Sequence, residues 1–325
     1  MNPGAPLPAF RERLPWCGGD LQTVRNLITG NRGAGVLSPG ERLWFDMPGG
    51  DRLTGVLHGN SSMQSRPLAV VVHGLAGGED SHYVVATAAH LQECGFPVLR
   101  LSLRGAGPAR ETCADGYHAG RTEDFALVLD ALRSLAPAGV VAVGYSLGGN
   151  MLLKHLGECG SDIELRAAVA ISAPIDLAAA SKRFLQPRNA LYQRWLLTHM
   201  KRDALTSKLR LDAPERAAIE AVRTVYEFDD RFVAPRHGFV DAEDYYRRCS
   251  AQRFVAGIAV PTLLLHAAND PWIPAEAFVE MRGRAGTHVT VEVTRGGGHV
   301  GFHGAGAAAR GRWQDAAIAR LFAEI

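Results

Sequence analysis

The chain has 325 residues, of which 47% are hydrophobic, so it is long enough to bury a large core as one domain with an insertion. Its formal net charge is only +2, and acidic and basic residues are spread along the whole sequence. The chain therefore lacks the basic stripe that binding to a phosphate backbone requires, and nucleic acid is not an expected partner. The sequence does not indicate an oligomeric state.

The cysteine pattern and the apolar runs bear on the cellular compartment. The five cysteines are an odd number and contain no CxxC pair, which argues against a disulfide framework and favours a reducing, cytoplasmic location. Residues 1–20 carry prolines and charges where a signal peptide needs an unbroken apolar region. The longest apolar runs, 167–173 and 261–268, are far shorter than the ~20 residues that cross a bilayer. No transmembrane segment is expected, and peripheral contact with a membrane is left as an alternative.

Short β-branched apolar runs alternate along the chain with longer segments of helical period. This pattern is typical of the α/β class, in which helices cover a mostly parallel sheet. The strands are predicted near Trp44–Met47, Leu53–His58, Leu68–Val72, Val98–Leu101, Val140–Val143, Ala167–Ile171, Thr262–His266 and Val289–Val293. The helices are predicted at Val84–Cys94, Glu123–Leu135, Leu147–Glu158, Glu276–Arg284 and Ala308–Ala323.

The third predicted strand leads into an HGxxG loop at residues 73–77. Such a loop presents backbone N–H groups that can bind a developing oxyanion, and we assign one of these donors to Leu75. Considered without its neighbours in the sequence, His73 could be taken for a catalytic base. Beside the glycines, it is expected to brace the loop.

The fifth predicted strand runs into a G-x-S-x-G pentapeptide centred on Ser146, and a helical pattern follows it. This order is typical of a nucleophile elbow, in which flanking glycines remove side chains that would collide while the hydroxyl points over the sheet edge. The positive end of the helix favours developing negative charge there. Leu147, directly after the serine, is the second predicted oxyanion donor. The alternative is a glycine-rich turn whose serine has no catalytic role.

The region from about residue 176 to residue 249 breaks the alternation, because it is charged and helical with scattered aromatic residues. We predict that residues 176–249 form a helical cap inserted into a core made of residues 1–175 and 250–325. Open α/β sheets bind ligands beyond the strand ends, so this cap could roof a substrate pocket. The alternative is helical packing without substrate contact.

A weakly nucleophilic serine needs a histidine within hydrogen-bond reach and a carboxylate that fixes the histidine tautomer. The expected chain order is serine, acid and histidine, each after a strand. Asp270 follows the seventh predicted strand, and His299 follows the last one through a glycine-rich loop. We therefore predict Ser146 as nucleophile, His299 as base and Asp270 as its orienting acid. The alternatives left open are His303 as base and Asp176 as acid, while His266 is expected to be structural.

Motifs along nearly the whole chain resemble the YheT/EMB8-like branch of the α/β hydrolases, which includes the abhydrolase-domain 1 and 3 proteins. The resemblance implies the α/β-hydrolase fold and a carboxylic-ester hydrolase whose triad falls on Ser146, Asp270 and His299. The matching segments are LQT (21–23), HGLAG (73–77), SHY (81–83), RGAG (104–107), YHAGRTED (117–124), GYSLGGN (144–150), SAP (172–174), YQR (192–194), EFDD (227–230), HGF (237–239), DYY (244–246), DP (270–271) and GGHVGF (297–302).

Two departures from the family weaken an inference of membrane localisation. The chain has no segment like the amino-terminal anchor of the animal relatives, and RGAG stands where relatives often carry a cysteine after the glycine. Relatives that act on phospholipids make a lipid ester a candidate substrate. The segment 117–124 is present, but the sequence assigns it no chemical role. His118 is expected to be structural, and a position in the pocket lining is the alternative.

The leading hypothesis is hydrolysis of short to medium acyl esters, or of lipid esters, through an acyl-serine intermediate. Such chemistry needs no cofactor, and the sequence contains no metal-ligand pattern such as HExxH. Two alternatives use the same fold: an acyltransferase with the same triad, and a binding protein without catalysis.

Overall fold

An eight-stranded sheet forms the centre of the molecule in the computed structural model, which describes residues 9–30, 35–59, 65–305 and 312–325. The strand order is β1-β2-β4-β3-β5-β6-β7-β8. The two pairings that involve β2 are antiparallel, and all the others are parallel, which confirms the predicted class. The strands are β1 (Glu41–Asp46), β2 (Arg52–His58), β3 (Leu68–Val72), β4 (Val98–Ser102), β5 (Val140–Tyr145), β6 (Leu165–Ile171), β7 (Thr262–Ala267) and β8 (Val289–Thr294).

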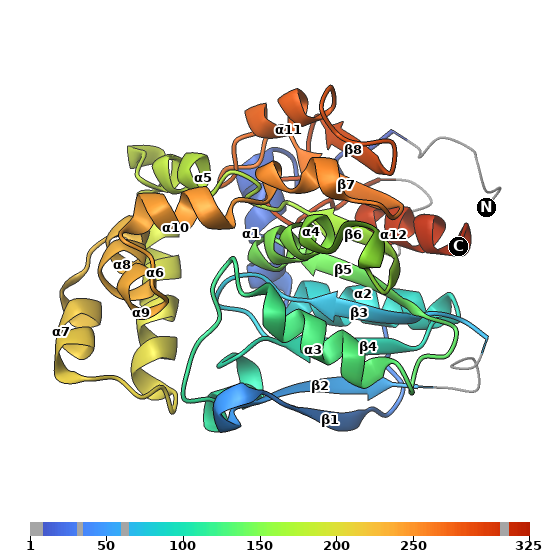
Figure 1. Cartoon of the computed structure of the whole chain (residues 1–325). Coiled ribbons are helices and arrows are strands. Elements are labelled where there is room, and N and C mark those ends of the chain that lie inside the picture. The colour runs from blue at the N-terminus through green and yellow to red at the C-terminus, as the bar shows by residue number, and fades with distance from the viewer. Residues whose placement is uncertain (1–8, 31–34, 60–64, 306–311) are drawn as a thin grey trace.

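Helices cover both faces of this sheet (Figure 1). One face packs against α3 (Thr122–Leu132), α4 (Leu147–Cys159) and α11 (Glu276–Met281), and the other against α2 (His82–Glu93) and α12 (Trp313–Ala323). Successive side chains of a strand point to opposite faces, so β3 sends residues 68, 70 and 72 into one core and residues 69 and 71 into the other. Burial on both faces explains why the central strands are unbroken apolar runs.

The predicted strands are all present, and the differences lie mainly at helix ends. α3 and α11 end a few residues before the predicted ends, because Pro137 and Gly283 follow and both residue types disfavour continued helix. Of the helix predicted at 308–323, the structure describes α12 from Trp313 onward. Residues 308–311 lie outside the described residues.

Outside the cap, the described residues include a helix that was not predicted, α1 (Gly19–Thr29). Its periodicity is inverted, because Gln22 and Asn26 are buried whereas Leu21 and Ile28 are 44% and 65% exposed. A search for apolar residues at helical spacing therefore misses it.

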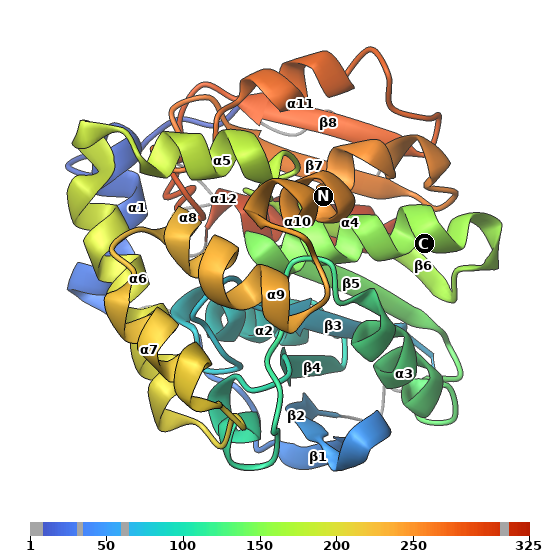
Figure 2. The ribbon, with the colours of Figure 1, turned by 60° about the vertical axis from the view of Figure 1, so that its left-hand side comes forward.

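Between β6 and β7 the chain forms a group of helices that lies to one side of the sheet (Figures 1 and 2). Phe184, Met200, Phe232 and Tyr245 belong to a separate apolar cluster among these helices. This group of helices is called the cap helices below. They are α5 (Leu177–Phe184), α6 (Ala190–Thr206), α7 (Ala213–Ala221), α8 (Val225–Phe228), α9 (Ala234–Arg236) and α10 (Ala242–Cys249). A π-helical turn over Asp229–Val233 joins α8 to α9.

Within the described ranges, none of the helices combines the length and the apolar character that a membrane span requires.

Candidate active site

Ser146 lies at the turn between β5 and α4 in a conformation that non-glycine residues rarely adopt, with φ 51° and ψ −122°. The neighbouring glycines have no room for a side chain. A Cβ atom at Gly148 would lie 2.3 Å from the His73 carbonyl oxygen, and one at Gly144 would lie 2.6 Å from the Gly148 oxygen. The backbone N–H of Ser146 donates to the Ile171 carbonyl at 2.8 Å. The turn thus has the tight, glycine-dependent geometry of a nucleophile elbow.

The structure brings the three predicted triad residues into one hydrogen-bonded chain. His299 Nε2 lies 3.1 Å from Ser146 Oγ, and His299 Nδ1 lies 2.9 Å from Asp270 Oδ2. The other carboxylate oxygen of Asp270 accepts the N–H groups of Trp272 at 2.8 Å and Ile273 at 3.0 Å. Both oxygens of the acid therefore have partners, and its orientation toward the imidazole is fixed.

The charge state of Asp270 suits this arrangement. Burial alone would raise the pKa of Asp270, but the interactions with His299 and with backbone N–H groups hold it below the usual value. An ionised Asp270 accepts the Nδ1 proton and leaves His299 Nε2 as an acceptor toward Ser146. The Trp272 ring stacks on the His299 ring, with centroids 4.4 Å apart, and restricts rotation of the imidazole.

The alternative triad residues are engaged elsewhere. The Asp176 carboxylate caps α5 by accepting the Ala179 N–H at 3.0 Å. His303 Nδ1 lies 3.2 Å from the Arg25 guanidinium, and burial together with that cation lowers the pKa of His303 to about 2. His266 stacks on Phe278 with centroids 4.1 Å apart. The structure therefore brings Asp270 and His299, rather than these residues, to Ser146.

The two predicted oxyanion donors lie beside the serine. Leu75 and Leu147 both line the pocket that contains Ser146, and a Cβ atom at Gly74 would lie 2.9 Å from Ser146 Cβ. In the described part of the chain, neither the Leu75 N–H nor the Leu147 N–H donates to a protein acceptor. Both groups are therefore free to bind a substrate oxygen.

Two tyrosine hydroxyls hold the loop around Leu75. The Tyr83 hydroxyl accepts the Gly74 N–H at 2.9 Å, and the Tyr117 hydroxyl accepts the Ala76 N–H at 2.8 Å. His73 adds a third support, because its Nδ1 bonds to the Gly74 oxygen at 2.7 Å and its Nε2 accepts the Leu103 N–H at 3.0 Å. Burial lowers the pKa of His73 to about 4, so it is neutral in this role.

Tyr117→Phe is expected to lower kcat for a p-nitrophenyl ester about tenfold with little change in KM. The variant leaves the Ala76 N–H without its acceptor, which costs about 1–3 kcal/mol. We expect the loop to shift in response and to displace the adjacent Leu75 N–H from the oxyanion position. Steady-state kinetics and thermal unfolding measure the two effects. Tyr226→Phe, outside the pocket lining, is the matched control. An unchanged kcat in folded Tyr117→Phe would remove the tyrosine from the support of the loop.

The LQT segment on α1 supports the histidine loop, a role that the sequence did not reveal. The His299 N–H donates to Thr23 Oγ1 at 2.8 Å. The Gln22 side chain accepts the His303 N–H at 2.7 Å and donates to the His303 carbonyl at 3.1 Å. The buried polar face of α1 thus fixes both ends of the loop that carries the imidazole.

The segment 117–124 also has a structural role. The guanidinium of Arg104 binds both carboxylate oxygens of Asp124, at 2.8 and 2.5 Å, and also binds Asp51 at 2.5 Å. The Asn150 amide on α4 donates to the Ala119 carbonyl at 3.1 Å. His118 lines the pocket, and burial lowers its pKa to about 3, so its ring is neutral. Together with the hydrogen bond between the Tyr117 hydroxyl and the Ala76 N–H, these contacts connect the loop around Leu75 to α3 and α4.

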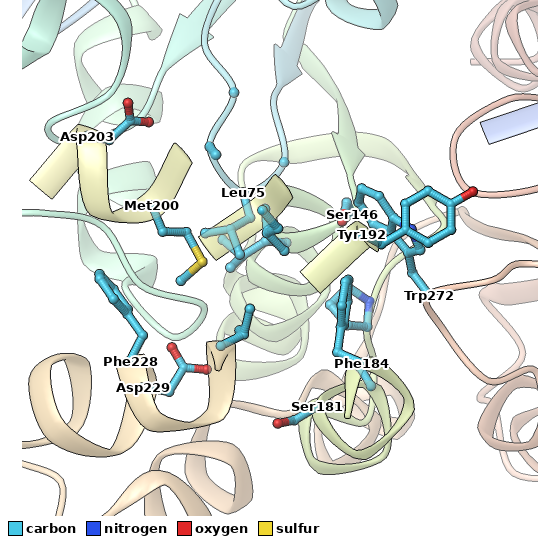
Figure 3. A pocket seen from close by; sticks show the side chains of 18 of the residues that line it. Leu75, Ser146, Ser181, Phe184, Tyr192, Met200, Asp203, Phe228, Asp229 and Trp272 are labelled. Atoms are coloured by element: carbon cyan, nitrogen blue, oxygen red, sulfur yellow. The ribbon is translucent and has the colours of Figure 1, made fainter. Parts of the chain in front are cut away.

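Core and cap side chains line one pocket of about 780 Å³ (Figure 3). Leu75, Ser146 and His299 come from loops at the strand ends, whereas Phe184 and Met200 come from the cap helices. Most of the lining is apolar, which suits hydrocarbon groups. Among the residues that the structure describes, no group of three or more His, Cys, Asp or Glu side chains could hold a metal ion.

Comparison with known proteins identifies the family. A family model described as the α/β-hydrolase fold matches residues 67–305, more than half of the chain. The chain is also 36% identical over 265 residues to the putative esterase YheT of Escherichia coli, a match that covers 80% of this chain and 78% of YheT. The chain belongs to the YheT-like branch of the α/β hydrolases. The predicted resemblance and the predicted α/β-hydrolase fold are confirmed.

Two further comparisons place this α/β hydrolase among its relatives. It is 28% identical over 241 residues to phospholipase ABHD3 of Mus musculus, which covers 73% of this chain and 59% of that protein. The match thus spans less than two thirds of this longer relative. The structure of the Pyrococcus furiosus esterase Pf2001 aligns with a TM-score of 0.59 and 14% identity, over 88% of this chain and 92% of that one. At this identity the likeness concerns the fold alone.

Proposed function

We propose that this α/β hydrolase cleaves carboxylic esters through an acyl-serine intermediate. His299 Nε2 takes the Ser146 proton as Oγ forms a bond to the ester carbonyl carbon, and the N–H groups of Leu75 and Leu147 bind the resulting oxyanion. The proton passes from His299 to the leaving alcohol as the carbon–oxygen bond breaks. Water then attacks the acyl-serine with His299 again as base, and the acid is released.

One observation carries this proposal: the hydrogen-bonded chain from Asp270 through His299 to Ser146, with distances of 2.9 and 3.1 Å, opens into an apolar pocket. The names of the relatives, an esterase and a phospholipase, support an ester substrate. The pocket volume of about 780 Å³ supports acyl chains of short to medium length, and a lipid ester is the larger candidate.

We also propose that the cap contributes to substrate binding, because its helices line the pocket that contains Ser146. We propose residues 176–249 as the cap and residues 1–175 and 250–325 as the two parts of the core. α5 begins and α10 ends close to these limits. The cytoplasmic location stays a prediction.

The experiment that tests the proposal is hydrolysis of p-nitrophenyl and glyceryl esters of increasing chain length, with and without added alcohol and thiol acceptors. We expect free acid as the main product. Predominant transfer of the acyl group to an acceptor would favour the acyltransferase alternative, since the same triad serves both reactions. Absence of turnover with every ester would favour the non-catalytic alternative.

A further inference from the structure

An acidic side chain of the cap faces the pocket at a distance from the triad. Asp229 begins the π-helical turn over Asp229–Val233, and it lines the same cavity as Ser146. In Figure 3 its carboxyl group points into the cavity beside Phe228. Turns of π-helix within helical segments occur frequently at functional sites.

Asp229 differs from the other aspartates of the pocket in lacking a cationic partner. Asp20 pairs with Arg188 at 3.1 Å, and Asp203 pairs with Arg110 at 2.8 Å. Within the described residues, no arginine, lysine or histidine forms an ion pair with Asp229. The contrast sets Asp229 apart from the pocket aspartates whose charge an arginine already neutralises.

The Asp229 carboxyl group has acceptor capacity that the protein does not use. The Tyr246 hydroxyl lies 2.7 Å from its Oδ2 atom and 3.2 Å from Ser181 Oγ. This is the one side-chain hydrogen bond to the carboxyl group in the described part of the chain, although a carboxylate offers about four acceptor positions. Burial raises the pKa of Asp229 to about 7, which reflects the cost of an unpaired charge in apolar surroundings.

The position of Asp229 relative to Ser146 indicates which part of the substrate reaches it. Figure 3 shows Trp272 and Tyr192 on one side of Ser146, and Asp229 on the other side, beyond Leu75. Trp272 stacks on His299, the group that protonates the leaving alcohol in the proposed mechanism. The orientation that we propose places the departing alcohol beside His299 and Trp272, and the acyl chain past Leu75 toward Asp229.

We propose that Asp229, held by Tyr246, binds a hydrogen-bond donor at the far end of the acyl chain. The preferred substrates are then esters of acids whose chain ends in a hydroxyl or an ammonium group, rather than esters of plain alkyl acids. This inference rests on the proposed ester hydrolysis. A site that contains a buried acceptor discriminates against substrates that leave the acceptor unpaired.

The test compares p-nitrophenyl esters of matched length whose terminal methyl group is replaced by a hydroxyl or an ammonium group. In the wild type we expect kcat/KM for at least one donor ester to exceed that of the alkyl ester about tenfold. Asp229→Leu should remove this preference and still hydrolyse the alkyl ester. Asp229→Asn, which keeps the shape but not the charge, should lose a preference for ammonium and keep one for hydroxyl. Asp130→Asn, at an exposed position of α3 outside the pocket lining, is the matched control, and its ratio of kcat/KM values should equal that of the wild type.

Several results would contradict the role of Asp229. These are equal kcat/KM for all three esters in the wild type, an Asp229→Leu variant that keeps the preference, and an Asp229→Asn variant that keeps a preference for ammonium. A preference among acetate esters for those whose alcohol carries the donor, if it is lost in Asp229→Leu, would overturn the orientation. Failure of the wild type to hydrolyse any of the esters would instead contradict the proposed function, so the two failures are distinguishable.

Discussion

Ser146→Ala is expected to lower kcat for a p-nitrophenyl ester by about a thousandfold or more while the fold is retained. The hydroxyl is the attacking group in the proposed mechanism, and the activity that survives its loss comes from binding and the oxyanion hole alone. Alanine keeps the Cβ atom, so the backbone strain at φ 51° is the same in both proteins. Steady-state kinetics give kcat, and thermal unfolding shows that the variant is folded.

A serine outside the site is the control for this substitution. Ser161 is exposed in the connection between α4 and β6, and Ser161→Ala should behave like the wild type. Turnover near the wild-type rate in a folded Ser146→Ala variant would show that another group is the nucleophile.

Asp270→Asn is expected to lower kcat about ten-thousandfold, whereas Asp176→Asn should have a far smaller effect. Asparagine preserves the shape of the acid, but its amide can donate to His299 Nδ1 and so stabilise the wrong tautomer of the imidazole, a change that costs ~10⁴ in a serine protease. Asp176 caps α5 instead, and asparagine is also a favourable capping residue. The comparison measures kcat for both variants on one ester.

Each aspartate variant is the control for the other, because Asp270 and Asp176 both follow a strand of the same sheet. A larger loss of kcat in Asp176→Asn than in Asp270→Asn would contradict the assignment of the acid.

The strands and the proposed triad could be predicted because each depends on a local pattern. The central strands are buried on both faces, so their apolar runs are unbroken and easily recognised. At the turn, Gly144 and Gly148 are required by the close approach of neighbouring backbone, and that requirement is visible as a motif. The order of Ser146, Asp270 and His299 follows from the order of strands that present them.

The supports of the site could not be predicted, because they depend on contacts between distant residues. Thr23 accepts a hydrogen bond from a residue 276 positions later, and α1 shows an inverted apolar pattern. The Tyr117 hydroxyl reaches a loop 41 positions earlier, and its residue type alone does not indicate this contact. Asp229 lies in the EFDD segment that resembles the family, but only the packing of the cap shows that it faces the pocket.

The most direct test of the proposed nucleophile is labelling of the full chain with a fluorophosphonate, followed by mass spectrometry of the peptides. The reagent phosphonylates a serine whose hydroxyl is activated by a neighbouring base. We expect one adduct, on Ser146, which forms much more slowly in Asp270→Asn and is absent from Ser146→Ala. An adduct on a different residue, or no adduct on folded wild-type protein, would contradict the assignment of Ser146 as the nucleophile.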